Sequence, residues 1–192
     1  MLFDVIGAIV SLLSTFYFIR LDKKAWPVSL IATCVNGYLY WQKGIYADMA
    51  LEAFYFLSTC YGWYLWSRPK KRKQSASIST LSFKQGLILF PLVGLSYLVI
   101  VKLLLSLTHS NVAVIDALTT SLSLAAQLLM CHKIISTWIL WFFTDALYAY
   151  LYFCKLIPIH GFLMLLYCGM AVAGYLRWSQ QQASQLKLLS VA

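Results

Sequence analysis

Four residues between positions 138 and 148 have the types and the spacing to bind a charged aromatic ligand. Trp138, Trp141, Asp145 and Tyr148 lie three or four residues apart, which places them on one face of an α-helix. They belong to a long apolar run, where an aspartate at the centre of a membrane helix costs about 2.5 to 3.5 kcal/mol. The faces of indole and phenol rings attract cations, and a carboxylate supplies the opposite charge. The pattern therefore predicts a site for an organic cation that carries an aromatic ring.

Lines of polar and aromatic residues also run along the other apolar segments. Polar residues that align on several membrane helices are expected to point inward, where they find partners or water. Weaker polar lines pair Ser11 with Thr15 and Ser123 with Gln127. Their hydroxyl and amide groups are suited to hydrogen-bonding a sugar or a pyrimidine. The predicted substrate-binding residues are Trp138, Trp141, Asp145, Tyr148, Asn36, Tyr40, Thr33, Glu52, Tyr55 and Gln127.

Other roles are open for several of these residues. Tryptophan gathers at membrane interfaces, so Trp66 and Trp178, close to the ends of their segments, are interpreted as interfacial anchors, and Trp26 fits either role. Asp145 could instead pair with a neighbouring hydroxyl and hold two helices together. The serine and threonine residues could serve close helix packing rather than binding.

The composition indicates an integral membrane protein. The chain of 192 residues is 61% hydrophobic and 11% charged, with a mean hydropathy of +0.76. Its net charge of +9 comes from short basic clusters between apolar runs, which argues against nucleic acid as a partner. The five cysteines show no ligand spacing and are expected to be buried packing residues, so neither a metal nor a cofactor is predicted. No motif of a hydrolase or of a nucleotide-binding loop occurs, and we predict that the protein is not an enzyme.

Seven apolar segments are each long enough to cross hydrocarbon as a helix. They cover residues 3–19, 25–42, 46–66, 86–107, 113–131, 135–154 and 157–178. The fold class that this predicts is an all-α integral membrane protein with seven transmembrane helices.

An internal repeat relates the first three segments to the last three. Residues from 26 to 67 align without gaps with residues 112 positions later, and identical pairs include Trp26 with Trp138, Tyr55 with Tyr167, and Gly62 with Gly174. A three-helix unit ends on the opposite side of the membrane from its start, so a parallel copy needs one intervening span. The predicted plan is therefore a 3+1+3 arrangement of parallel repeats with the site between the halves.

The basic residues orient the chain. Twelve of the 15 lysines and arginines lie on the side that holds the C-terminus, which predicts an outer N-terminus and a cytosolic C-terminus. The predicted units are a first repeat at 1–67, a basic cytoplasmic linker at 68–85, a connecting helix and outer loop at 86–112, a second repeat at 113–179, and a cytoplasmic tail at 180–192. That tail is interpreted as a solvated end.

Two stretches of the sequence carry a family resemblance. NGYLYWQKGIYADMALEAFYFLSTCYGWYLW and TWILWFFTDALYAYLYFCKL resemble the PnuC-type family of bacterial vitamin transporters. Its Trp-x-x-Trp-x-x-x-(Asn or Asp) motif is met by Trp138, Trp141 and Asp145, and a Tyr-Gly-Trp-Tyr stretch begins at Tyr61. The resemblance runs from about residue 10 to 178.

The resemblance implies a SWEET-like fold in the bacterial cytoplasmic membrane that carries nicotinamide riboside inward by facilitated diffusion. It also implies capture of the vitamin by a cytosolic kinase and assembly as a homo-oligomer, a trimer. Carriers of nicotinamide riboside are expected to have Asn in place of Asp145 and Gln in place of Glu52, so this chain departs from that pattern. Thiamine, also an aromatic cation, is the alternative substrate. Proton-coupled transport and a membrane sensor that binds without transporting are further alternatives.

Overall fold

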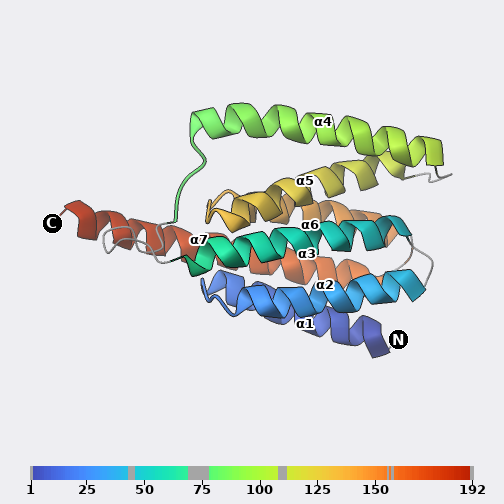
Figure 1. The fold of residues 1–192 in the computed structure, drawn as a ribbon, viewed down its shortest axis with the longest axis horizontal. Helices are drawn as coiled ribbons and strands as arrows, with labels where there is room; N and C mark the ends of the chain where they lie inside the picture. Colours follow the sequence, from blue (N-terminus) through green and yellow to red (C-terminus); the bar gives the residue numbers. More distant parts are fainter. Residues whose placement is uncertain are drawn as a thin grey trace.

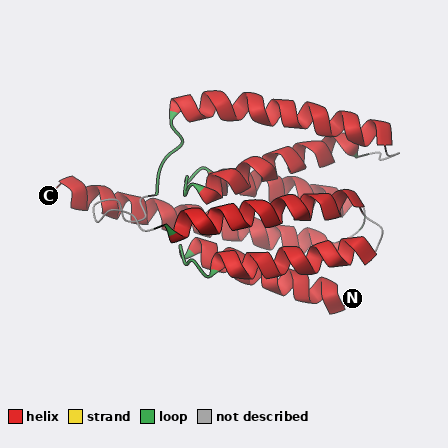
Figure 2. Ribbon diagram, viewed as in Figure 1, coloured by secondary structure: helices red, strands yellow, loops and turns green. Residues whose placement is uncertain are grey.

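The described part of the chain folds into seven helices. The computed structural model describes residues 2–42, 46–68, 78–107, 112–154, 156 and 158–190. The helices are α1 (Leu2–Ile19), α2 (Ala25–Gln42), α3 (Tyr46–Ser67), α4 (Phe83–Leu107), α5 (Ala113–Cys131), α6 (Thr137–Cys154) and α7 (Pro158–Ser190). Within these ranges the remaining residues form loops and turns (Figure 2). The basic segment 69–77, Lys43 and Lys155, on which part of the topology prediction depends, lie outside the described residues.

The helices form two groups of three with α4 beside them. α2 packs between α1 and α3, α6 packs between α5 and α7, and the groups meet where α3 contacts α5 and α1 contacts α7. α4 packs against α5, on the outside of the bundle (Figure 1). The helix axes run broadly along one direction, and the two termini lie at opposite ends of the molecule. The central space of the bundle is therefore bordered by all helices except α4.

The helices differ in how long their apolar stretches are. Among the described residues, the helical stretches Phe83–Ser106, Ala113–Cys131 and Pro158–Leu188 are long and apolar enough to span a membrane, and Val5–Ile19 is a shorter apolar helix. The chain is a multi-pass membrane protein.

Two turns at one end of the bundle have the same backbone. After α1, Leu21 has φ 55°, its N–H donates to Phe18 (3.0 Å), and the next N–H donates to Tyr17 (3.0 Å). After α5, Lys133 has φ 56°, and the corresponding bonds reach Met130 (3.1 Å) and Leu129 (3.0 Å). This is the Schellman pattern of helix termination. Each residue of the second turn lies 112 positions after its counterpart in the first.

A buried cluster closes the same end of the bundle, and it corrects the interpretation of the tryptophans. Trp26 and Trp178 are 0% exposed and Trp66 is 4% exposed, so none is an interfacial anchor. The rings of Trp26 and Trp66 meet edge to face at 5.3 Å, and those of Trp138 and Trp178 at 5.5 Å. We call this the aromatic cluster; its buried members are Phe18, Ile19, Ala25, Trp26, Trp66, Ile78, Met130, Cys131, Ile135, Trp138, Ala171 and Trp178.

Indole nitrogens and glycines hold the cluster together. Trp66 Nε1 donates to the Cys131 carbonyl and Trp178 Nε1 donates to the Phe18 carbonyl, both at 3.1 Å, so each bond joins one group of helices to the other. A Cβ atom at Gly62 would overlap the Trp26 ring, and one at Gly174 would overlap the Trp138 ring. Both positions therefore need a residue without a side chain.

Two other expectations differ from the structure. α4 begins at Phe83, three residues before the predicted start, so the linker is shorter than 68–85. Cys34, Cys60 and Cys154 are exposed rather than buried, whereas Cys131 and Cys168 are buried. The tail 180–192, interpreted as a solvated end, is mostly exposed between 180 and 188, but it is helical, because α7 continues to Ser190, and Gln182 and Gln185 bond to Ile78.

Candidate functional site

A cavity of about 280 Å³ lies between the two groups of helices. Its size is close to the lower end of the range of roughly 300 to 1,000 Å³ that is usual for small-molecule sites. Polar and aromatic side chains dominate its walls, and α1, α2, α3, α5, α6 and α7 all contribute. The lining residues are Ser11, Ser14, Thr15, Phe18, Ser29, Ala32, Thr33, Asn36, Glu52, Tyr55, Thr59, Gln127, Met130, Trp138, Trp141, Asp145, Tyr148, Met164, Tyr167 and Ala171.

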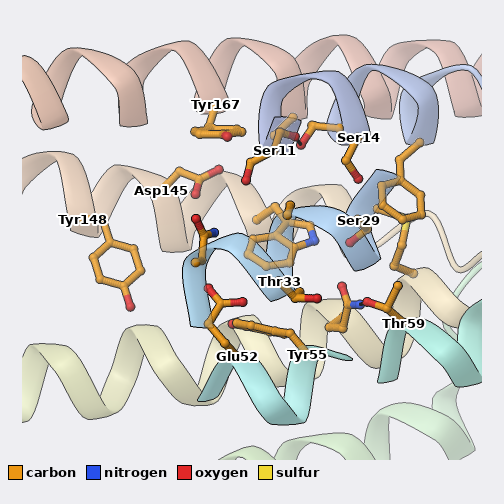
Figure 3. Close-up of a pocket in the computed structure, with 18 of the residues that line it drawn as sticks. Ser11, Ser14, Ser29, Thr33, Glu52, Tyr55, Thr59, Asp145, Tyr148 and Tyr167 are labelled. Carbon is orange, nitrogen blue, oxygen red and sulfur yellow. Dashed lines mark hydrogen bonds between the residues drawn. The ribbon is translucent and has the colours of Figure 1, made fainter. Parts of the chain in front are cut away.

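Two acidic side chains enter the cavity from different helices. Asp145 lies on α6 and is 8% exposed, and Glu52 lies on α3 and is half-buried. Figure 3 shows both carboxylates directed into the same space, from opposite walls. No hydrogen bond or ion pair to Asp145 is found within the described part of the chain, which leaves the structural pairing of this residue without support. A buried carboxylate in this position is suited to a cationic ligand.

The two motif tryptophans differ in their surroundings. Trp138 is 2% exposed and packs in the aromatic cluster, with part of its surface at the cavity wall. Trp141, one turn further along α6, is half-buried and also lines the cavity. Trp141 is therefore the better placed of the two to stack on a ligand, and Trp138 supports the wall behind it.

Two tyrosines connect the helix groups across the cavity. Tyr55 on α3 donates its hydroxyl hydrogen to Ser123 Oγ on α5 at 2.6 Å. Tyr167 on α7 lies close to Ser11 on α1 (Figure 3). Both tyrosines line the cavity. Tyr167 lies 112 residues after Tyr55, and Ser123 lies 112 residues after Ser11, so the two pairs occupy equivalent positions. Each pair brings one group of helices to the other.

Amide and hydroxyl groups complete the polar wall. Gln127 Nε2 donates to Thr59 Oγ1 at 3.4 Å, which links α5 to α3. The Thr33 hydroxyl donates to the Leu30 carbonyl of its own helix at 3.0 Å and keeps its oxygen available as an acceptor. Asn36 on α2 and Tyr148 on α6 also line the cavity, and they occupy equivalent positions of the sequence repeat. These groups offer donors and acceptors to a polar ligand.

Nine of the ten residues predicted as substrate-binding line this one cavity, and Tyr40 does not. Tyr40 is half-buried on α2, one turn beyond Asn36. A substrate-binding role for Tyr40 therefore has no support from the lining of this cavity. The lining also includes residues that the sequence pattern did not single out, namely Ser14, Phe18, Ala32, Met130, Met164, Tyr167 and Ala171. Of these, Tyr167 has a signal in the sequence, because it is the repeat partner of Tyr55.

Loss of the two cross-cavity tyrosine hydroxyls is expected to lower the stability of the fold symmetrically. Tyr55→Phe and Tyr167→Phe each remove one hydroxyl and leave the ring in place, and loss of the Tyr55 bond to Ser123 costs about 0.5 to 1.5 kcal/mol. We expect the two variants to lower the Tm of the detergent-solubilised protein by similar amounts, and the double variant to lower it by more. Tyr175→Phe, at an exposed residue of α7 outside the cavity, is the control and should leave Tm unchanged. A large effect of one single variant with none of the other would contradict the equivalence.

Three comparisons relate this chain to known proteins. The profile of a family described as nicotinamide mononucleotide transporter matches residues 1–180. Relatives named nicotinamide riboside transporter PnuC, from Escherichia coli (strain K12) and Shigella flexneri, are each 26% identical over 137 residues. The match covers 58% of this chain and 57% of each relative, so it spans little more than half their length. The crystal structure of the vitamin B3 transporter PnuC superposes with a TM-score of 0.77 at 19% identity, covering 95% of this chain and 83% of that one.

Proposed function

The chain belongs to the nicotinamide mononucleotide transporter family, and from that premise we propose that it carries a cationic aromatic vitamin across the membrane, with nicotinamide riboside as the substrate. The observation that carries this proposal is the cavity between the helix groups, where Asp145 and Glu52 face each other beside Trp141. A pyridinium ring can stack on the indole while a carboxylate balances its charge. The relatives named as nicotinamide riboside transporters support the same substrate.

The chemistry of the lining favours the riboside over the mononucleotide. The described lining residues include two acidic side chains and no lysine, arginine or histidine. A phosphate group would meet like charge and no charged donor, which is unfavourable in a partly buried site. A ribose hydroxyl, in contrast, can bond to the serine, threonine and amide groups of the wall. The proposed substrate is therefore the dephosphorylated form.

We propose that the helices form two parallel repeats joined by α4, in the 3+1+3, SWEET-like order, with seven membrane spans. The equivalent turns at Leu21 and Lys133 support this, as do the equivalent cavity positions of Tyr55 and Tyr167. α4 contacts α5, and its apolar face is left to lipid. Rocking of the two groups about the cavity would then expose the site to each side in turn.

The proposed mode is facilitated diffusion into the cytosol of a bacterial cell across its inner membrane. The sequence-based topology assigns 12 of the 15 basic residues to the side that holds the C-terminus, which supports placing that side in the cytosol. Net accumulation then needs a cytosolic kinase that phosphorylates the vitamin, and the protein assembles as a homo-oligomer, a trimer. A protonophore should leave the uptake rate unchanged; inhibition would instead favour a proton-coupled carrier.

Binding and transport by purified protein test the proposed function. We expect nicotinamide riboside to quench the tryptophan fluorescence of the protein in a saturable titration, because Trp141 lines the site. Thiamine is the competing substrate, riboflavin is the neutral control, and nicotinamide mononucleotide tests the argument from charge. Proteoliposomes then separate a carrier from a sensor. A ligand that binds but never reaches the lumen would contradict transport.

Removal of the Trp141 ring is expected to weaken binding. Trp141→Ala deletes the stacking surface, and the expected loss is about 1 to 3 kcal/mol in binding free energy. Trp63→Ala, an exposed tryptophan of α3 outside the cavity, is the control for general effects of losing an indole. Isothermal titration with nicotinamide riboside measures both. Equal affinity of Trp141→Ala and the wild type would place the ligand elsewhere.

A further inference from the structure

The chain just before α4 is fastened across the end of the bundle that the aromatic cluster closes. Ser79 N–H donates to the Lys133 carbonyl at 3.1 Å, and Ile135 N–H donates to the Ser79 carbonyl at 2.9 Å. The two segments form an isolated parallel bridge between Ser79 and Ile134. We call residues 78–80 the strap.

α7 holds the other side of the strap. The Ile78 N–H donates to Gln185 Oε1 at 3.3 Å, and Gln182 Nε2 donates to the Ile78 carbonyl at 3.2 Å. Both glutamines lie in the part of α7 that continues past the predicted span. The Ile78 side chain is 4% exposed and belongs to the aromatic cluster. A residue of the linker thus completes a core that is otherwise built from helices and from the turn after α5.

The aromatic cluster is also the floor of the cavity. Phe18, Met130, Trp138 and Ala171 belong to the cluster and line the cavity as well. Phe18 comes from the first group of helices and the other three from the second. A ligand that leaves the cavity at this end must therefore part the cluster, including the Trp66 bond to Cys131 and the Trp178 bond to Phe18.

We propose that the strap is a latch on the exit of the carrier. It follows α3 of the first helix group along the chain and is hydrogen-bonded to the second group, at the turn after α5 and at the extension of α7. While these four bonds and the buried Ile78 are in place, the floor of the cavity stays closed. Opening requires the strap to leave the turn after α5. The inference rests on the proposed transport function for its direction, with this end facing the cytosol.

A reversible cross-link tests the latch in the intact protein. Bridged residues lie about 4.8 Å apart, a separation that a disulfide can span. In the Ser79→Cys/Ile134→Cys variant, oxidation should reduce nicotinamide riboside uptake into proteoliposomes by about tenfold or more, and reduction should restore it. Ser79→Cys alone, treated in the same way, controls for the native cysteines. Equal uptake by the oxidised and reduced double variant would overturn the proposal.

A second measurement does not depend on the substrate or on uptake. Cys131 is 1% exposed in the aromatic cluster, so it reports on opening of the floor. Gln182→Ala/Gln185→Ala removes the α7 side of the latch, and the rate of Cys131 alkylation, followed by mass spectrometry, should rise about tenfold. Ser184→Ala, at an exposed residue of the same helix, should leave it unchanged. An unchanged rate in the glutamine variant would refute the latch even if the substrate proves to be another vitamin. Failure of wild-type uptake alone would instead reject the proposed function.

Discussion

Asp145→Ala is expected to abolish most of the affinity for nicotinamide riboside. The carboxylate is 8% exposed, lines the cavity, and has no hydrogen bond or ion pair among the described residues, so a bound cation would be its partner. Removing one member of a buried charge pair costs about 2 to 5 kcal/mol. We therefore expect binding by the variant to be weaker by a factor of roughly thirty to several thousand. Fluorescence titration of the purified variant measures this.

The matched substitution Asp145→Asn separates charge from hydrogen bonding. It keeps the shape of the side chain and a carbonyl acceptor, and it removes the negative charge. If the charge is what binds, this variant should lose most of the affinity for the cation while a neutral analogue, such as the reduced riboside, loses little. Full affinity of Asp145→Asn for the cation would reject the counter-ion role. Glu52→Gln, on the opposite wall, shows whether the second carboxylate contributes in the same way.

Gly174→Leu is expected to destabilise the fold strongly. A Cβ at this position would overlap the Trp138 ring, which is itself 2% exposed and packed against Trp178. Neither indole has space to move, so the expected cost is about 3 kcal/mol or more. In a chain of this size, that corresponds to a fall in Tm of more than about 6 °C. Thermal unfolding of the detergent-solubilised protein measures it.

Gly169 provides the matched control, because it lies in the same helix and a Cβ there would meet nothing within 4 Å. Gly169→Leu should leave Tm nearly unchanged. Gly62→Leu should reproduce the effect of Gly174→Leu, since the Trp26 ring occupies the corresponding space. A stable Gly174→Leu protein would mean that the aromatic cluster is loosely packed.

Most of the helices and of the site could be predicted because both depend on patterns within single segments. A run of apolar residues defines a span, and an aspartate three or four residues from a tryptophan and a tyrosine defines a helix face. That is why Trp141, Asp145 and Tyr148 were placed together correctly. The sequence repeat also relates Tyr55 to Tyr167, which lies 112 positions later.

What could not be predicted depends on how the ends of the helices meet. Trp66 and Trp178 are near the ends of their predicted spans, where tryptophan usually faces the membrane interface. Here Gly62 leaves space for the Trp26 ring, which packs against Trp66. Gly174 likewise leaves space for the Trp138 ring, which packs against Trp178. Tyr40 lies one turn beyond Asn36 on α2, and it does not line the cavity. The helical form of the tail was not predicted, and neither were the bonds of Gln182 and Gln185 to the backbone at Ile78, which no periodicity reveals.

α7 is long enough for its C-terminal part to act as a lever. From Arg177 to Ser190 the helix continues without interruption, and at 1.5 Å per residue this stretch is about 20 Å long. It projects past the neighbouring helices toward the C-terminus (Figure 1). Because a helix tilts as a rod, a 10° rotation within the bundle would sweep the tip of this rod through roughly 3 to 4 Å. Small rearrangements around the cavity would thus be magnified at the far end of α7.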